Sequence, residues 1–173
     1  MIEIEDQIIN KVANSGLITI DLEDFIPKSE NVVYDLKQNL FMDMILREKD
    51  FREFIKAHDW DQYSGKNLAI TCSEDVLIPT WAYMLLVTKL QPKAKKIVFG
   101  DLQKLEETVI DEAISTINIE KYRDAKIVVK GCSKGEIPVS AYVKITNLLM
   151  PIAQSIMFGE PCSTVPLYKR SKQ

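Results

Sequence analysis

Three cysteines are the residues of this sequence whose type and placement could support chemistry. Cys72 and Cys132 each follow an apolar segment rich in β-branched residues and each begin a Cys-Ser step, and Cys162 follows a third such segment by a few residues. A thiolate is both a nucleophile and a soft metal ligand. His58, the only histidine, offers one imidazole nitrogen as a further ligand. These four residues indicate thiol or metal chemistry as the first hypothesis.

An internal repeat predicts how two of the cysteines are positioned. At an offset of 59, the segments 78–101 and 137–160 share 10 identical positions of 24, and the two Cys-Ser steps lie just upstream of them. We expect residues 66–101 and 125–160 to form two copies of one β-loop-α-β unit. A strand, a crossover helix and a second strand form the unit from which parallel sheets are built.

Apolar periodicity and turn residues predict the remaining elements. A first helix begins near Ile4, and a helix over 101–117 joins the two copies. The predicted strands cover 17–22, 32–36, 40–45, 67–71, 96–99, 126–130 and 155–158, and the other helices cover 46–58, 80–90 and 138–149.

These elements predict an α/β fold in one domain over residues 1–173, with a mostly parallel sheet and an antiparallel N-terminal edge. The carboxyl ends of parallel strands meet at one edge, where loops diverge and helix N-termini stabilise anions. Cys72, Cys132 and Cys162 would all lie at that edge. A helix N-terminus lowers the pKa of a nearby thiol, which favours the reactive thiolate.

Three interpretations of the thiols remain open. In the first, they are packing residues, because cysteine is among the most buried residue types. In the second, they bind zinc or an iron–sulfur cluster. In the third, they are thiols with a redox function. No C-x-x-C motif is present to favour a zinc knuckle or a thioredoxin-type pair. His58 would be the fourth metal ligand, or alternatively would cap the C-terminus of the preceding helix.

Composition excludes some classes of function. The 173 residues carry a formal net charge of −3 and a pI near 5.3, so a basic surface for nucleic acid is not expected. No apolar run is long enough to cross a membrane and the N-terminus is not basic, which predicts a cytoplasmic protein. The sequence has no phosphate-binding glycine-rich loop and no nucleophile elbow. A homodimer would be consistent with the repeat.

The sequence resembles a family of small Bacteroidetes proteins known as domain of unknown function 2480. The resemblance extends over nearly the whole chain and is carried by the strings SGLITIDLEDF (15–25), LREKDFR (46–52), HDW (58–60), TWAY (80–83), KGCS (130–133) and FGEPCSTVPLYK (158–169). The family has no established activity. Its members are often encoded beside the Suf iron–sulfur assembly genes, so the resemblance implies a role in cluster assembly and Suf proteins as partners.

Three hypotheses of function follow. The first is an accessory protein of iron–sulfur assembly or metal handling, with Cys72, Cys132, Cys162 and His58 at the metal. The second is a thiol redox or sulfur-transfer enzyme. The third is a non-catalytic interaction module, which we expect to bury its thiols and to alkylate slowly at every cysteine. Whether the protein is an enzyme is left open.

Overall fold

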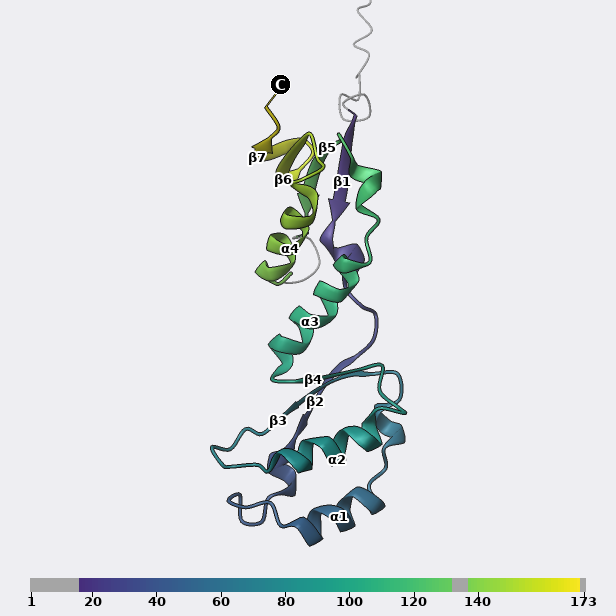
Figure 1. Cartoon of the computed structure of the whole chain (residues 1–173), viewed down its shortest axis with the longest axis vertical. Coiled ribbons are helices and arrows are strands. Elements are labelled where there is room, and N and C mark those ends of the chain that lie inside the picture. The colour runs from purple at the N-terminus through teal and green to yellow at the C-terminus, as the bar shows by residue number, and fades with distance from the viewer. Residues whose placement is uncertain (1–15, 132–136, 172–173) are drawn as a thin grey trace, which may run out of the picture. The chain divides into compact units, whose positions relative to one another are not determined.

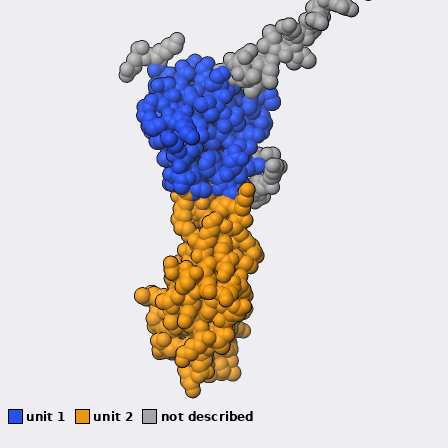
Figure 2. Space-filling model, turned by 90° about the vertical axis from the view of Figure 1, so that its right-hand side faces the viewer, with its two compact units in different colours: residues 1–26, 113–173 blue, residues 27–112 orange. Residues whose placement is uncertain are grey.

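The computed structural model describes residues 16–131 and 137–171, which form two compact units. Unit 1 comprises residues 1–26 and 113–173, and unit 2 comprises residues 27–112 (Figure 2). Unit 2 is therefore inserted in the sequence of unit 1. The predicted helix near Ile4 and the thiol of Cys132 lie outside the described residues.

Each unit has its own sheet, so the α/β class is confirmed while the prediction of one sheet is wrong (Figure 1). Unit 1 orders its strands β1-β5-β6-β7, and unit 2 orders them β2-β3-β4. The strands are β1 (Leu17–Asp21), β2 (Asn31–Asp35), β3 (Asn67–Thr71), β4 (Lys96–Phe99), β5 (Lys126–Lys130), β6 (Ser155–Glu160) and β7 (Ser163–Lys169). The helices are α1 (Glu48–Ala57), α2 (Thr80–Leu90), α3 (Leu102–Ser115) and α4 (Val139–Leu149).

The predicted antiparallel edge at the N-terminus is wrong. β1 pairs in parallel with β5, and β2 pairs in parallel with β3. The antiparallel pair is β6–β7, at the C-terminal end of the chain. A long connection separates β1 from β5, and such connections permit parallel pairing, whereas β6 and β7 are joined by a two-residue turn.

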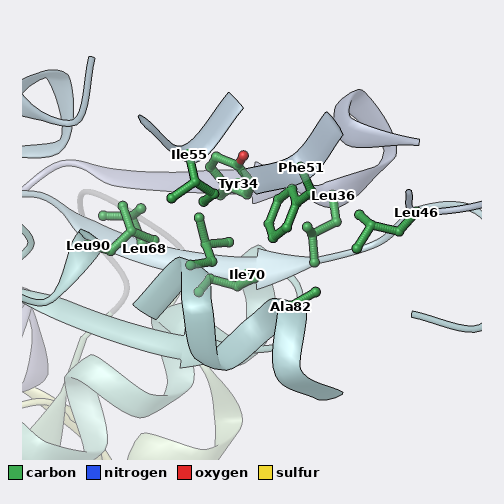
Figure 3. Packing of buried hydrophobic residues seen from close by; sticks show 10 residues of the cluster. Tyr34, Leu36, Leu46, Phe51, Ile55, Leu68, Ile70, Ala82 and Leu90 are labelled. Atoms are coloured by element: carbon green, nitrogen blue, oxygen red, sulfur yellow. The ribbon is translucent and has the colours of Figure 1, made fainter. Parts of the chain in front are cut away.

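The core of unit 2 explains why its central strand, β3, is apolar on both faces. Leu68 and Ile70 point to one face of β3, where they pack with α1 and α2 around Phe51 and Leu86 (Figure 3). Ala69 points to the other face and packs with residues of α3. Because successive strand residues alternate between faces, a strand covered on both sides must be continuously apolar.

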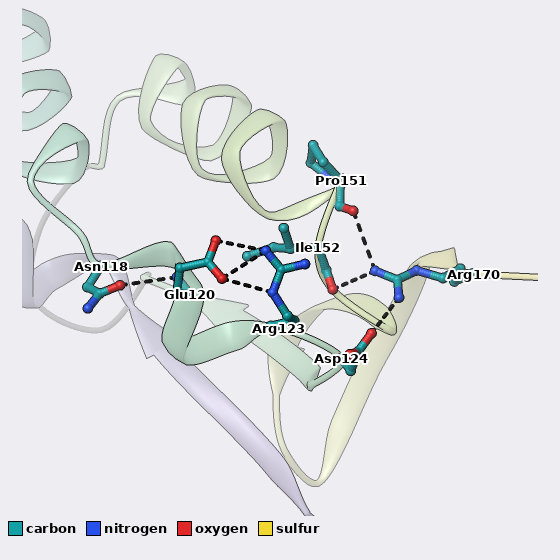
Figure 4. Close-up of polar contacts among 7 residues, drawn as sticks. All are labelled: Asn118, Glu120, Arg123, Asp124, Pro151, Ile152 and Arg170. Atoms are coloured by element: carbon teal, nitrogen blue, oxygen red, sulfur yellow. Dashed lines mark hydrogen bonds and ion pairs between the residues drawn. The ribbon is translucent and has the colours of Figure 1, made fainter.

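Residues 59 positions apart make equivalent contacts in the two units. Gly65 and Asp124 both have a positive φ, at 73° and 57°. Their backbone N–H groups donate to the carbonyls of Lys93 and Ile152, at 3.0 and 2.9 Å. In unit 1, Arg170 adds side-chain contacts to the Asp124 carboxylate and to the Ile152 carbonyl (Figure 4). The same turn is thus formed by glycine in one unit and by an aspartate held by arginine in the other.

The tyrosines of the repeat also occupy equivalent positions. Tyr83 meets Phe99 edge-on with ring centroids 5.3 Å apart, and Tyr142 meets Phe158 at 5.8 Å. Both pairs place a helix against the last strand of its β-loop-α-β unit. The repeat therefore preserves the same aromatic packing contact in each unit.

Candidate functional site

Cys72 and Cys162 follow strands of two different sheets. Cys72 follows β3 in unit 2, whereas Cys162 lies in the β6–β7 turn of unit 1. The premise of a single shared sheet is therefore wrong, and Cys132 lies outside the described residues. Within residues 16–131 and 137–171, no group of three or more His, Cys, Asp or Glu side chains could hold a metal ion. The three-thiol site itself remains a prediction.

Cys72 is half-buried at the edge of the unit 2 core. Its side chain packs against the apolar cluster that α1 and α2 form with the sheet. Burial raises the pKa of the nearby Tyr83 hydroxyl, and the negative charge of a Cys72 thiolate raises it further. The apolar contacts of Cys72 are those that the packing interpretation predicts.

Cys162 is exposed, in contrast to Cys72. It occupies the two-residue turn between Glu160 and Ser163, which are paired in the β6–β7 ladder. The expectation that an interaction module would bury every thiol is therefore wrong for Cys162. An exposed thiol is open to solvent reagents.

His58 lies among aromatic rings. Its ring centroid is 4.6 Å from those of Phe54 and Trp60, and its Nε2 lies 3.0 Å from the Gln62 amide nitrogen and 3.4 Å from the Tyr63 hydroxyl. His58 is also the C-cap residue of α1, where its backbone N–H donates to the Phe54 carbonyl. His58 thus lies at the end of the helix, as predicted, but the contacts of its imidazole are with aromatic rings, Gln62 and Tyr63 and not with the helix carbonyls.

A polar network closes the carboxyl end of the unit 2 sheet. The Asp35 carboxylate accepts hydrogen bonds from the backbone N–H groups of Lys37 and Ser73, at 2.9 and 3.0 Å. Burial alone would raise the pKa of Asp35, but a hydrogen bond from the Ser73 side chain, the two backbone hydrogen bonds and the charge of Lys37 together outweigh it and lower the pKa. The Lys37 ammonium also pairs with Glu74. The charged groups of Asp35, Lys37 and Glu74 near Cys72 are therefore paired with one another or with backbone N–H groups. These contacts hold the backbone of the segment that follows β3.

Unit 1 has an ionic counterpart of this network. The Lys130 ammonium lies 3.2 Å from the Asp21 carboxylate and 3.7 Å from that of Glu160. The hydrogen bond to Asp21 and the charges of both carboxylates raise the pKa of Lys130. This ion pair connects the carboxyl ends of β1, β5 and β6.

The feature that the sequence prediction missed is an apolar hairpin over Phe41–Ile45. We expected a strand over 40–45, but the structure has a tight turn closed by a bridge between Phe41 and Ile45. The Met44 N–H donates to the Phe41 carbonyl at 3.1 Å, and the Phe41 N–H donates to the Ile45 carbonyl at 2.8 Å. Met42 and Asp43 have φ values of 53° and 55°. Two left-handed residues in succession are the mark of a type I′ turn.

The apolar hairpin exposes side chains that normally lie inside a protein. Met42 is 70% exposed, Met44 68%, Ile45 57% and Phe41 36%. A signal for the turn was present in the sequence, because Asp43 interrupts the apolar run and aspartate is depleted in strands.

A pocket lies beside the hairpin, and we call it the side-chain pocket. Its volume is about 210 Å³, and it is lined by both aromatic and polar residues. The lining residues are Gln38, Asn39, Leu40, Phe41, Asp50, Phe51 and Phe54. At its rim, the Arg47 guanidinium carbon lies 3.1 Å from the centroid of the Phe41 ring. This corner of unit 2 therefore combines exposed apolar surface with a concave site.

Comparisons with known proteins identify a family but no activity. No curated protein matches the chain, and no solved structure matches it. No helix among the described residues is both long and apolar enough to cross a membrane. A family model described as "Protein of unknown function (DUF2480)" matches residues 6–170, which confirms the resemblance in the sequence. The chain therefore belongs to the DUF2480 family.

Proposed function

We propose that this protein is a non-catalytic interaction module that contacts its partner through the apolar hairpin, Phe41–Ile45. The observation that carries the proposal is the exposure of four large apolar side chains on a turn whose backbone is strained. A non-glycine residue in the left-handed region costs about 1–2 kcal/mol, and aspartate less than most. Strain of this kind is characteristic of functional sites.

The composition of the hairpin suits a binding surface. Methionine is flexible and polarisable, so it adapts to the shape of an apolar partner and is frequent on surfaces that bind other proteins. Met42 and Met44 are both exposed at the tip. Burying them against a partner would recover the hydrophobic free energy that the isolated chain forgoes.

Site-specific photo-crosslinking tests this function. A benzophenone amino acid is placed at Met44 or, as a control, at Leu77, which is 95% exposed but lies outside the hairpin. We expect a defined intermolecular adduct in cells from position 44 and not from position 77, and mass spectrometry of the adduct identifies the partner. An adduct of twice the chain mass would make that partner a second copy. Equal crosslinking from both positions, no adduct, or a crosslink from position 44 within the same chain would contradict the proposal.

A second proposal is that the protein handles a metal or an iron–sulfur cluster, as an accessory to the Suf assembly proteins. It is supported by Cys162, whose exposed thiol is accessible to a metal or to a partner protein. Protein purified without oxygen, with each of Cys72, Cys132 and Cys162 changed to Ser, is analysed for iron and zinc. Stoichiometric metal that each change removes would support this role, whereas metal-free protein would end it.

A further inference from the structure

We infer that the side-chain pocket takes the cationic side chain of a lysine or arginine that the partner presents beside apolar residues. The inference rests on the proposed function, because the pocket adjoins the apolar hairpin through Phe41, which belongs to both. It adds a chemical specificity that an apolar surface alone would lack.

The size of the pocket fits one side chain. Its volume of about 210 Å³ is below the range of about 300–1,000 Å³ typical of sites for drug-sized ligands. A lysine or arginine stem with its polar head is of the right order for such a space. The pocket is therefore suited to a single anchoring residue of a longer polypeptide.

The lining of the pocket complements a positive charge. Phe41 and Phe54 are accessible aromatic residues of the lining, and the faces of aromatic rings attract cations; Phe51, which also lines the pocket, is 1% exposed and packs in the core. Asp50 contributes the only charged group of the lining, a carboxylate that is exposed. An ammonium or guanidinium can pair with this carboxylate while its aliphatic stem packs on the rings.

The amides of the lining are oriented by bonds to neighbouring groups. The Gln38 amide nitrogen donates to the Asp35 carbonyl at 2.9 Å, which fixes the orientation of this side chain. The Asn39 oxygen accepts from the Tyr34 hydroxyl at 2.9 Å. Both amide side chains of the lining are therefore held in place by hydrogen bonds within unit 2.

Arg47 shows that a cation is stable at this rim. Its guanidinium carbon lies 3.1 Å from the Phe41 ring centroid, and its Nη1 lies 3.9 Å from the Asp50 carboxylate. Arg47 is not among the residues that line the pocket. The ion pair is long and exposed, so it contributes little and leaves Asp50 available to a second cation.

Selection from a library of displayed heptapeptides tests both the inference and the function on which it rests. Wild-type full-length protein is the bait, and the affinity of synthetic selected peptides is measured by calorimetry. We expect peptides with a Lys or Arg next to apolar residues. Their affinity should fall about tenfold with Asp50→Asn, the size of effect expected from one partly exposed charge-assisted contact.

A matched control separates the loss of the carboxylate from effects on the helix. Glu48→Gln also removes a negative charge from the first turn of α1, but Glu48 does not line the pocket. It should leave peptide affinity unchanged. Circular dichroism and the urea midpoint establish that each variant is folded.

The outcomes distinguish the two claims. Apolar peptides without a cation, weakened by Met44→Ser and indifferent to Asp50→Asn, would overturn the cationic anchor and leave the interaction module in place. Selected peptides that are indifferent to both changes, or a selection that enriches none, would overturn the proposed function as well.

Discussion

Replacing Met42 with asparagine should stabilise unit 2, because the backbone conformation at this residue is unfavourable for methionine. Met42 has a φ of 53° and is the first central residue of the type I′ turn, where asparagine is strongly preferred. Met42 is 70% exposed, so its replacement removes little buried apolar surface. The substitution therefore changes backbone strain more than packing.

The expected gain follows from the cost of the left-handed region. That cost is about 1–2 kcal/mol for an ordinary L-residue and is smaller for asparagine. We expect Met42→Asn to raise the free energy of unfolding by about 1 kcal/mol, which corresponds to a rise in Tm of roughly 2–4 °C for a chain of this size.

The control is the same substitution at a methionine with ordinary backbone. Met84 is 67% exposed and lies within α2. Met84→Asn should lower stability by about 0.5 kcal/mol, because asparagine has a lower helix propensity than methionine. The two variants differ in backbone conformation far more than in exposure.

Urea unfolding followed by tryptophan fluorescence measures both variants. Trp60 and Trp81, the only tryptophans, belong to unit 2, so their emission reports the unit that contains the hairpin. Opposite signs for the two substitutions would support the strain argument. If Met42→Asn lowered the urea midpoint as Met84→Asn does, the reasoning from φ would be wrong.

Three further predictions concern unit 2 and the thiols. Asp35→Asn should lower the free energy of unfolding by about 0.5–1 kcal/mol at neutral pH, because a charge-assisted acceptor is lost. The pKa of Asp35 is lower in the folded than in the unfolded chain, so this stabilisation is present above the unfolded value of about 3.9 and is lost as the pH falls through the folded pKa. The urea midpoints of the wild type and of Asp35→Asn should therefore converge as the pH is lowered from 7 to 2. A difference between the two midpoints that stayed constant over this range would refute the link between the Asp35 pKa and stability. In the native protein, iodoacetamide should alkylate Cys162 faster than Cys72, because Cys162 is exposed and Cys72 is half-buried. Peptide mapping measures both alkylation rates, and equal rates would contradict this difference in exposure. Leu86→Ala should cost about 2–5 kcal/mol by urea unfolding, because Leu86 is fully buried in α2; a loss below 1 kcal/mol would show that the core of unit 2 is not packed around it.

Local patterns in the sequence predicted most elements but not the hairpin. The helix over 80–90 and the strands over 67–71, 96–99 and 126–130 have the predicted bounds, because apolar periodicity and flanking Pro and Gly act within a few residues. The strand over 40–45 was wrong. The apolar residues of this segment have the pattern of a strand, and the segment has no glycine to indicate the turn at Met42–Asp43.

The last strand was also missed. β7 contains Pro166, and proline normally argues against a strand. Its place explains the exception, because β7 is the edge strand of its sheet and pairs only with β6. A missing N–H is tolerated on the open side of an edge.

The sequence by itself determined the α/β class and the family, while the tertiary structure decided which strands share a sheet. The pairing of β1 with β5 and of β2 with β3 depends on hydrogen bonds between residues far apart in the chain, on which local composition carries no information. That pairing separates Cys72 from Cys162 into two units. The long-range pairing, and not the residue types, therefore placed the strands that precede these two thiols in different sheets.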